Sequence, residues 1–317
     1  GNFVQLHNHT HYSLLDGAAK VPDLVKRVKE LGMPAVGITD HGNMHGAYEL
    51  WRAAVDSGVK PIIGIEAYVT PETARQDKTR VSWDTNWTPV PGHARNPDDV
   101  SGGGLITHLT MSAENDEGLV NLIKASSVAN LEGRVMRYPR MDKEVLSTYS
   151  KGVIASSGCP SGIIQTRLRL GQFDEALRAA GEFQDIFGKD NFYIELMDHG
   201  LSIESKVTGD LLTIAKKLGA PLLATNDSHY VMEADKDAQD AMLCINSGAT
   251  LDDPNRFKFE GSGYYIKSAE EMRELFKDHP DACDNTLEIA ERCNVIFDDH
   301  EDGAFMPQFD CPEGWDE

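Results

Sequence analysis

Gly1-Asn-Phe-Val-Gln-Leu-His-Asn-His-Thr-His-Tyr-Ser-Leu-Leu-Asp16 opens the chain and combines a short apolar strand with ligand-type side chains. His7 and His9 follow the strand at a spacing of two, so in extended chain both imidazoles project from one face. Two neutral imidazoles on one face can share a divalent cation, and Asp16 adds a carboxylate after a short loop. A short His-rich stretch is also typical of a surface loop, so the metal interpretation depends on the rest of the chain.

Apolar runs of strand length recur along the chain, and each is followed by a helix-like segment. Most are mainly apolar rather than alternating, as expected for strands buried on both faces of a parallel sheet. The runs cover residues 3–6, 35–39, 61–69, 105–111, 152–155, 192–196 and 221–225.

Helical periodicity fills the intervals between these runs and continues after the seventh. This repetition predicts an α/β fold, either a parallel barrel or a doubly wound sheet, with extra helices at the C-terminal end. The predicted helices cover residues 21–31, 47–55, 173–187, 207–218, 237–246, 268–276 and 281–293.

Two segments do not fit the repetition. Residues 71–104 contain four prolines, Trp83 and Trp87, and are too long for an ordinary connection, so we expect an excursion over the barrel mouth. The two tryptophans either pack this excursion onto the body or stack on a nucleotide. Residues 297–317 are acidic, contain proline and read as a tail that follows a domain of residues 1–296.

Composition limits the partners and the compartment. The net charge of −21 argues against binding of nucleic acid through a general electrostatic field, so metals or basic surface supplied elsewhere must hold any phosphate substrate. The five cysteines include no C-x-x-C pair, and their odd number does not describe a disulfide framework, which favours the cytoplasm. No apolar run approaches the length of a membrane span.

Polar side chains able to bind metal stand at the ends of the apolar runs. In parallel α/β folds such groups gather at the carboxyl ends of the strands, and a buried carboxylate or imidazole needs a partner that a metal cluster would supply. The mixture of imidazoles, carboxylates and one thiolate suits Zn²⁺ and is compatible with Mn²⁺ or Fe²⁺. The candidate metal ligands are His7, His9, Asp16, His41, Glu66, His108, Cys159, Asp227 and His229.

These motifs resemble the PHP (polymerase and histidinol phosphatase) family over nearly the whole chain: His-x-His at the start, Thr-Asp-His-Gly at 39–42, Glu66, His108, Cys159, and Asp-x-His at 227–229. Other segments are similar to the N-terminal PHP domain of bacterial replicative DNA polymerases. They are Tyr12-Ser-Leu-Leu-Asp-Gly-Ala18, Leu31-Gly-Met-Pro-Ala35, Ala224-Thr-Asn-Asp227, Ile289-Ala-Glu-Arg-Cys-Asn294 and Phe305-Met-Pro-Gln-Phe309. The 71–104 excursion is wider than this family leads us to expect.

The resemblance implies a distorted seven-stranded (β/α)7 barrel with a trinuclear metal centre. One ion would be held by His7, His9, Glu66 and Asp227; a second by Glu66, His108 and Cys159; the third by Asp16, His41 and His229. Every one of these positions carries a residue able to bind metal. The tail would lead toward a polymerase palm domain that this chain does not contain, so we expect no polymerisation by these residues themselves.

The remaining candidates have more ordinary interpretations. We expect His11 and His45 to lie at the edge of the site or on the surface, and Asp40 to orient His41 or cap the next helix. Metal binding by Glu195 and His199 stays open, because both face the correct end of the barrel. His93, His279 and His300 lie in loop or tail contexts.

The leading functional hypothesis is therefore twofold. The resemblance implies a parent DNA polymerase of chromosomal replication, with other polymerase domains and replicase subunits as partners. The domain's own chemistry would be 3′–5′ exonucleolytic hydrolysis of a DNA 3′ end by a metal-bound hydroxide, without a dedicated side-chain base. The alternatives are a phosphomonoesterase similar to histidinol phosphatase, and a metal centre that only stabilises the polymerase.

Overall fold

The computed structural model describes residues 2–91 and 95–298. Its strands are β1 (Ala35–Ile38), β2 (Lys60–Val69), β3 (Thr107–Ala113), β4 (Arg140–Met141), β5 (Val153–Ser156), β6 (Phe192–Leu196) and β7 (Leu222–Ala224). Its helices are α1 (Val21–Glu30), α2 (Ala47–Ser57), α3 (Ser101–Gly104), α4 (Asp116–Glu132), α5 (Lys143–Thr148), α6 (Ile163–Arg169), α7 (Phe173–Phe187), α8 (Ser202–Leu218), α9 (Lys236–Ser247), α10 (Ala269–Leu275) and α11 (Pro280–Arg292).

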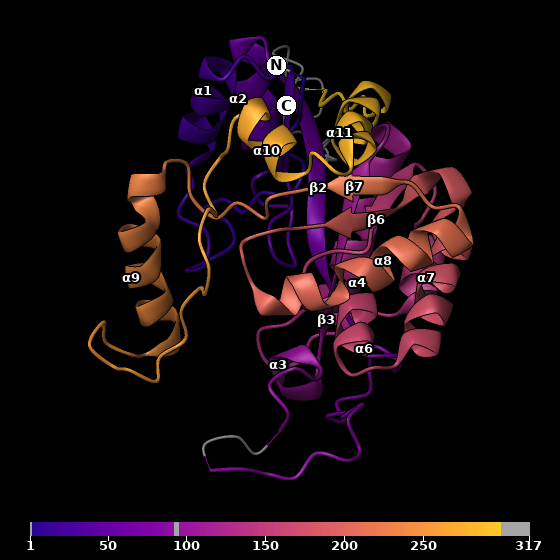
Figure 1. Cartoon of the computed structure of the whole chain (residues 1–317). Coiled ribbons are helices and arrows are strands. Elements are labelled where there is room, and N and C mark those ends of the chain that lie inside the picture. Colours follow the sequence, from indigo (N-terminus) through magenta and orange to yellow (C-terminus); the bar gives the residue numbers. More distant parts are fainter. Residues whose placement is uncertain (1, 92–94, 299–317) are drawn as a thin grey trace, which may run out of the picture.

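The seven strands form one curled sheet in the order β1-β2-β3-β5-β6-β7, with β4 beside β2 (Figure 1). Most pairs are parallel, but β3 runs antiparallel to both β2 and β5, so the expectation of an all-parallel sheet is wrong at β3. The reversal brings the amino end of β3 to the rim where its neighbours end, and Tyr68 pairs with His108 there.

The N-terminal segment closes this sheet. Gln5 pairs with Val36 of β1, and Asn8 pairs with Ser228 just beyond β7. The amide of Gly37 donates to the carbonyl of Gln5 at 2.8 Å, and the amide of His9 donates to the carbonyl of Ser228 at 2.7 Å. The predicted first strand is thus present as a bridging segment, and the sheet forms the distorted seven-stranded barrel expected from the sequence.

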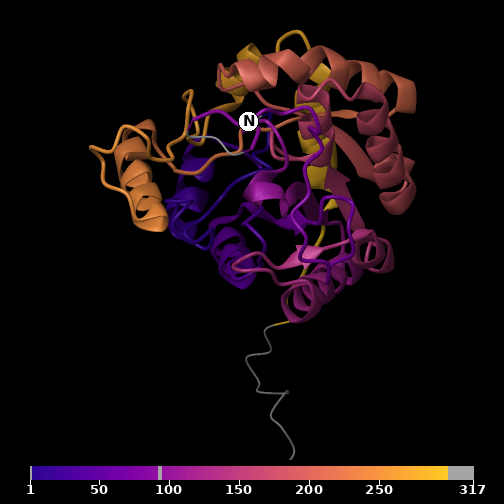
Figure 2. The ribbon, with the colours of Figure 1, turned by 90° about the horizontal axis from the view of Figure 1, so that it is seen from below.

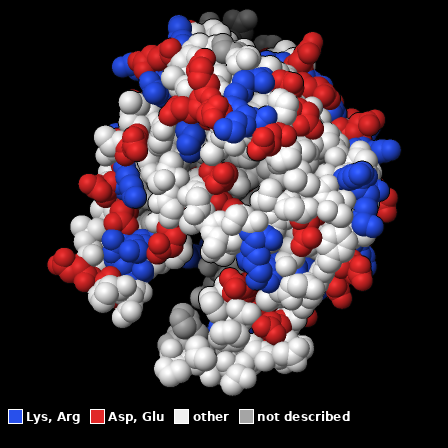
Figure 3. Space-filling model, in the orientation of Figure 1, with Lys and Arg blue, Asp and Glu red and all other residues white. Residues whose placement is uncertain are grey.

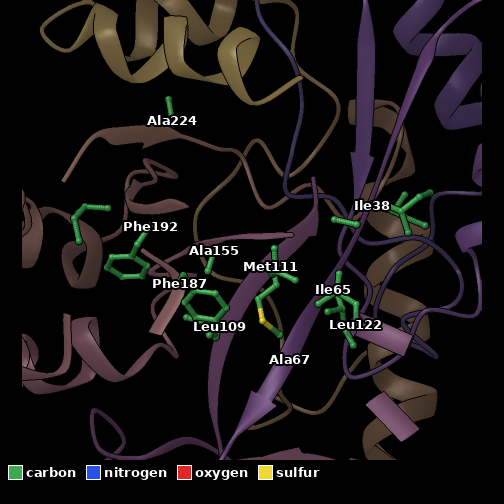
Figure 4. Packing of buried hydrophobic residues seen from close by; sticks show 14 of the residues in the cluster. Ile38, Ile65, Ala67, Leu109, Met111, Leu122, Ala155, Phe187, Phe192 and Ala224 are labelled. Atoms are coloured by element: carbon green, nitrogen blue, oxygen red, sulfur yellow. The ribbon is translucent and has the colours of Figure 1, made fainter. Parts of the chain in front are cut away.

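Helices surround the barrel, as the view from below shows (Figure 2). The side chains between sheet and helices are buried and closely packed (Figure 4), among them Ile65 of β2, Leu109 of β3 and Phe192 of β6. In α1 the buried residues Val21, Leu24, Val25 and Val28 recur with helical periodicity, which is why the sequence predicted this helix.

Inside the barrel, the alternation along each strand produces layers. Ile62, Ile154 and Leu223 share an apolar cluster with Ile289 of α11, which covers the end of the barrel opposite the site. Four residues further along β2, on the same face, stands Glu66. The interior therefore changes from apolar to polar toward the rim, and the polar rim is where the site forms.

Some elements were not predicted. Helices α3, α4, α5 and α6 and the two-residue β4 are additional, and α8 begins five residues before the predicted start at 207. No helix of the described residues is long and apolar enough to cross a membrane.

The 71–104 excursion lies at the site end of the barrel (Figure 1). Trp83 packs against the main core, and the Arg167 guanidinium lies 3.8 Å from the centre of a Trp83 ring, so this tryptophan packs the excursion onto the body. The ring of Phe297 packs near Trp51 at a centroid distance of 5.6 Å. The domain boundary at 296 stays a prediction, and residues 299–317, with His300, Cys311 and the 305–309 motif, lie outside the described residues, as does His93.

Candidate metal centre

His7 and His9 stand side by side at the polar end of the barrel. Both are fully buried, and their Nε2 atoms lie 3.4 Å apart. Asp227 Oδ1 lies 3.3 Å from the Nε2 of His7 and 3.1 Å from that of His9. The period-two prediction for the pair therefore holds, because both rings face one carboxylate.

Glu66 is the central carboxylate of the site. Its side chain is 1% exposed, and Oε2 lies 3.1 Å from His9 Nε2 and 2.9 Å from His41 Nδ1. Oε1 lies 3.1 Å from His108 Nδ1 and 3.6 Å from His7 Nε2. One carboxylate thus faces four imidazoles from three parts of the chain, as a bridging ligand would.

Asp16, His41 and His229 form the outer part of the site. Asp16 Oδ2 lies 2.8 Å from His41 Nε2 and 3.2 Å from His229 Nε2. The loop that carries Asp16 turns at Gly17, where a Cβ atom would sit 2.3 Å from the carbonyl oxygen of Thr10. Glycine is therefore required for the approach that brings Asp16 to the histidines.

Cys159 reaches the site from the loop after β5. Its Sγ lies 3.3 Å from His108 Nδ1. Burial raises the pKa of the thiol well above its usual value, and the Glu66 and Asp227 carboxylates raise it further. A cation bound at Cys159 must displace that proton, because the thiolate is the form that binds metal.

Seven of the nine predicted ligands, from His7 to His229 in sequence, form overlapping groups of donor atoms. The other two lie beside these groups, Asp16 against His41 and Cys159 against His108. Within each group the donor atoms lie within 4.8 Å of one another. The groups are His7, His9, Glu66 and Asp227; His41, Glu66 and His108; and His9, His41 and His229. The first matches the predicted first ion, whereas His41 stands where Cys159 was expected in the second and His9 where Asp16 was expected in the third.

The hydrogen bonding of the ligand atoms also fits a site for divalent cations. Glu66 Oε2, Asp227 Oδ1 and His41 Nδ1 are buried atoms that make no well-directed hydrogen bond, although Glu66 Oε2 and His41 Nδ1 lie only 2.9 Å apart. Buried polar atoms with poorly directed contacts cost free energy, and all three belong to the same cluster. Asp227 also has a φ of +44°, uncommon for a residue with a side chain and typical of functional sites.

The imidazoles and carboxylates of the site shift one another's pKa values. Burial lowers the pKa of the His7 imidazole, but the carboxylates of Glu195, Asp227 and Glu66 outweigh burial and leave this pKa well above its usual value. Burial raises the pKa of the Glu66 carboxyl, yet the imidazoles around it hold that pKa well below its usual value. Cations entering such a site would replace protons on the imidazoles.

Glu195 supports the site rather than joining the donor groups. Its Oε1 accepts from His7 Nδ1 at 2.6 Å and its Oε2 from Ser156 Oγ at 2.5 Å, while Thr225 donates to Oε1 at 2.5 Å. A carboxylate that accepts from Nδ1–H fixes the ring and turns its Nε2 lone pair toward the other ligands. The sequence placed Glu195 at the correct end but not against His7, which is 188 residues away.

Asp40 acts on a different histidine from the one expected. It accepts from Ser13 Oγ at 2.7 Å, and Ser13 Oγ lies 2.8 Å from His9 Nδ1. Because Ser13 gives its only hydroxyl proton to Asp40, its oxygen accepts from His9 Nδ1–H. Asp40 therefore orients the His9 ring through Ser13, and it acts on His41 only through the backbone, because the His41 amide donates to the same Ser13 Oγ at 3.1 Å. No side chain of the described residues caps the next helix, α2.

Among the described residues, the other histidines lie outside the donor groups. His199 bonds to Glu204 at 2.6 Å and to the carbonyl of Asn226 at 2.8 Å, which supports the loop carrying Asp227. His11 packs on Tyr12 at a centroid distance of 4.2 Å, and His45 is exposed.

A cleft of about 620 Å³ leads from the site to the surface. Asp16, His41 and His108 line it at the site, and Arg134 and Arg137 line it further out. Acidic and basic side chains are mixed on the face of the molecule drawn in Figure 3. Arg134 and Arg137 thus add two positive charges to the outer part of the cleft, although the chain has a net charge of −21.

Comparison with known proteins identifies relatives of this chain. Residues 5–199 match the family model described as the PHP domain. The chain is 52% identical over 317 residues to the DNA polymerase III subunit alpha of Mycobacterium leprae, covering 100% of this chain and 26% of that protein. It is 55% identical over 297 residues to the protein of the same name from Saccharopolyspora erythraea, covering 93% and 25%. The chain thus spans about a quarter of the length of these relatives.

A comparison with solved structures finds more distant similarity. An amidohydrolase from Chromobacterium violaceum superposes with a TM-score of 0.42 at 15% identity, covering 72% of this chain and 87% of that one.

Proposed function

The chain belongs to the PHP domain family, and we propose that it is the PHP domain of a bacterial replicative DNA polymerase with a phosphodiesterase activity of its own. The reaction we propose is 3′–5′ exonucleolytic removal of nucleotides from DNA. The sequence similarity to DNA polymerase III alpha subunits supports the first part. The convergence of seven ligand-type side chains within overlapping donor groups, with Asp16 and Cys159 beside them, supports the second.

The donor set favours three divalent cations, with zinc as the first choice and manganese or iron as alternatives. Imidazole and thiolate ligands suit zinc, whereas the carboxylates Asp16, Glu66 and Asp227 are also compatible with manganese and iron. When bound, such ions supply Lewis-acid stabilisation of a phosphoryl group and lower the pKa of water.

The chain's own residues prepare the site for this chemistry. Glu195 and Ser13 hold the Nδ1 protons of His7 and His9, so the Nε2 atoms of both rings face Glu66 and Asp227. The Nδ1 of His229 lies 2.8 Å from the Asp227 carbonyl oxygen, which leaves its Nε2 toward Asp16. Ligands fixed before binding lose little conformational entropy when the cations enter.

The cleft favours a phosphodiester over a phosphomonoester. It extends past the metal ligands to Arg134 and Arg137, and a small monoester has no group to place there. A DNA strand continues beyond its terminal nucleotide and carries a phosphate at every step. With this role we propose a cytoplasmic location, with the other polymerase domains and replicase subunits as partners.

The test compares two substrates and two Glu→Gln variants. Metal-loaded protein is incubated with a 3′-labelled DNA primer and, separately, with p-nitrophenyl phosphate. We expect release of the labelled nucleotide by the wild type and by Glu117→Gln, an exposed glutamate of α4, and its loss in Glu66→Gln. Circular dichroism confirms that both variants fold.

The other outcomes separate the alternatives. Nucleotide release that survives Glu66→Gln would indicate a contaminating nuclease. Hydrolysis of the monoester alone would indicate a phosphatase of the histidinol phosphate type. Inactivity of fully metallated wild type toward both substrates would indicate that the metals only stabilise the polymerase.

A further inference from the structure

One wall of the cleft is a tight hairpin of residues 133–139. Val135 and Tyr138 exchange two backbone hydrogen bonds of 3.0 Å, and Met136 at the turn has a φ of +55°. The hairpin exposes the side chains of Arg134 and Arg137, which both line the cleft. Two guanidinium groups are thus carried on a short, hydrogen-bonded turn.

A buried arginine anchors this hairpin. Arg140 is fully buried, and its guanidinium donates to the carbonyls of Gly133 at 3.1 Å and Leu105 at 3.2 Å. It also donates to the carbonyls of Arg75 at 2.8 Å and Asp77 at 2.7 Å, which belong to the start of the 71–104 excursion. The hairpin base is therefore tied to the start of the excursion and to the segment just before β3, and Arg137 projects from a fixed support.

Helix α9 provides the facing wall and stands outside the barrel (Figures 1 and 2). Leu243, Asn246 and Ser247 of this helix line the cleft. Arg137 Nη1 donates to Asn246 Oδ1 at 2.7 Å, which links the two walls across 109 residues of sequence. Water competes for both groups of an exposed hydrogen bond, so its net contribution is small and Arg137 can exchange Asn246 for a stronger partner.

Phosphate is that stronger partner. The planar guanidinium presents paired donors that match two phosphate oxygens at once, and a phosphate adds an attraction between opposite charges that the single amide oxygen of Asn246 lacks. Asn246 offers a neutral amide oxygen in the position where an anion would be preferred. Asn246 therefore occupies the donor groups of Arg137 in the absence of an anion, and a bound phosphate would replace it.

An aromatic side chain completes the cleft. Phe257 lines it with 61% of its surface exposed, although a large apolar ring is usually buried. The centroid of its ring lies 6.1 Å from that of the Phe259 ring, and the Phe259 centroid lies 4.6 Å from that of the His229 ring. Exposed aromatic rings beside basic groups are typical of proteins that bind single-stranded nucleic acid by stacking.

We propose that this cleft binds a single-stranded DNA segment next to its 3′ end, with Arg137 leaving Asn246 for a backbone phosphate and Phe257 stacking on a base. The proposal rests on the proposed function for the identity of the substrate. It adds the residues that select a DNA strand over a small phosphodiester. No bond is made or broken in this step, so binding alone tests it.

The experiment measures binding by fluorescence anisotropy, with a labelled 12-nucleotide single strand and residues 1–317 as the protein. All proteins carry Glu66→Gln, which removes hydrolysis and does not alter Arg137, Asn246 or Phe257, so the variants are compared on one background. The variants are Arg137→Gln, Phe257→Ala and Asn246→Ala, with Arg52→Gln on α2 as a control of equal charge that does not line the cleft. Salt titrations give the slope of log Kd against log salt.

The expected effects differ between the variants. Arg137→Gln weakens binding about tenfold and reduces the salt slope by about 0.7, the contribution of one phosphate contact on a single strand. Phe257→Ala weakens binding by about fivefold, as expected for loss of one stacked base, with an unchanged slope. Asn246→Ala leaves binding equal or tighter, and Arg52→Gln leaves it unchanged.

The proposal is overturned if Arg137→Gln binds like the parent with the same slope, or if Arg52→Gln loses as much as Arg137→Gln. Hydrolysis decides the proposed function separately. If the wild type binds DNA through Arg137 but hydrolyses none, the DNA-binding role of the cleft is supported and the exonuclease activity is rejected. If the wild type cleaves DNA and Arg137→Gln cleaves it with the same KM, the exonuclease activity is supported and the DNA-binding role of the cleft is rejected.

Discussion

Glu66 shows how single residues of this chain combine folding and chemistry. It occupies an inward position of β2, where the next inward residues toward the other end of the barrel are Gly64 and Ile62. A carboxylate with a 1% exposed side chain is stable there because imidazoles surround it and hold its pKa well below the usual value. A bridging ligand is the role that uses all of these contacts at once.

At the same scale, Glu195→Gln tests the support behind His7. The glutamine keeps the size but replaces one acceptor oxygen with a donor, so His7, Thr225 or Ser156 loses its acceptor. We expect metal affinity to fall by about 10- to 100-fold, as for other groups that orient a ligand. Competition with a chelator measures the affinity, and the control is Glu117→Gln.

An unchanged affinity in Glu195→Gln would show that His7 is held by packing alone. A variant that retains its metals but loses nucleotide release would assign Glu195 a role in the reaction instead.

At the scale of elements, the loop from His9 to Asp16 depends on one glycine. A Cβ at Gly17 would lie 2.3 Å from the Thr10 carbonyl oxygen, so Gly17→Ala must move the loop and Asp16 with it. We expect the loss of one metal equivalent and a destabilisation of about 1–3 kcal/mol. The matched control is Gly209→Ala within α8, where nothing lies within 4 Å and the helix should gain about 0.5–1 kcal/mol.

Metal analysis and chemical unfolding of these two alanine variants measure the effects. Equal metal content in Gly17→Ala and in the wild type would show that the Asp16 loop adapts without cost to the site.

The start of the 71–104 excursion is held by an ion-pair network that predicts acid sensitivity. Burial opposes ionisation of Glu72, but hydrogen bonds from Arg178 and Arg167 outweigh it and hold its pKa below the usual value. Because the folded-state pKa is below the unfolded one, this stabilisation is present above the unfolded pKa near 4.5 and is lost as pH falls through the folded value.

Unfolding of metal-free protein at pH 7 and pH 4 tests this network. We expect Glu72→Gln to lose stability at pH 7 and to approach the wild type as the pH falls. Glu30→Gln, an exposed glutamate of α1, should differ little from the wild type at either pH. A constant difference between Glu72→Gln and the wild type would mean that the carboxyl contributes by shape rather than charge.

The elements also show how far the sequence can be interpreted. Apolar runs located six of the strands because each strand is buried on both faces, and period-two spacing placed His7 and His9 on one side. The direction of β3 was missed because strand direction depends on the connections rather than on composition. Helix α4 was not named because its buried side includes Gly118, Ala125 and Ala129, which give a weak apolar stripe.

The candidate ligands could be named from the sequence because most stand in or just after a strand and all have a residue type able to bind metal. Their supports could not. Glu195 meets His7 across 188 residues, and Arg137 meets Asn246 across 109, so only the folded chain shows these pairs.

At the scale of the whole molecule, the metal centre joins segments that are far apart in sequence. The N-terminal segment closes the barrel between β1 and the end of β7, and its histidines share ligand groups with residues of β2 and of the loop after β7. Cations bound there would connect both sides of the closure. Metal binding should therefore stabilise the fold as a whole.

Metal removal measures this coupling. A ligand at 100 times its dissociation constant stabilises the folded state by about 2.7 kcal/mol for each site. We expect a strong chelator to lower the melting temperature by at least about 5 °C in the wild type and by much less in Glu66→Gln. Equal shifts in both proteins would mean that the metals stabilise regions outside the site.

The most direct test of the central claim is the number of metal ions bound per chain, measured by inductively coupled plasma mass spectrometry after metal loading and desalting. The claim is that side chains from residue 7 to residue 229 bind divalent cations together. We predict three ions in the wild type and the loss of at least two in Glu66→Gln, since Glu66 belongs to two of the ligand groups. Less than one ion in the loaded wild type, or equal numbers in both proteins, would contradict the account.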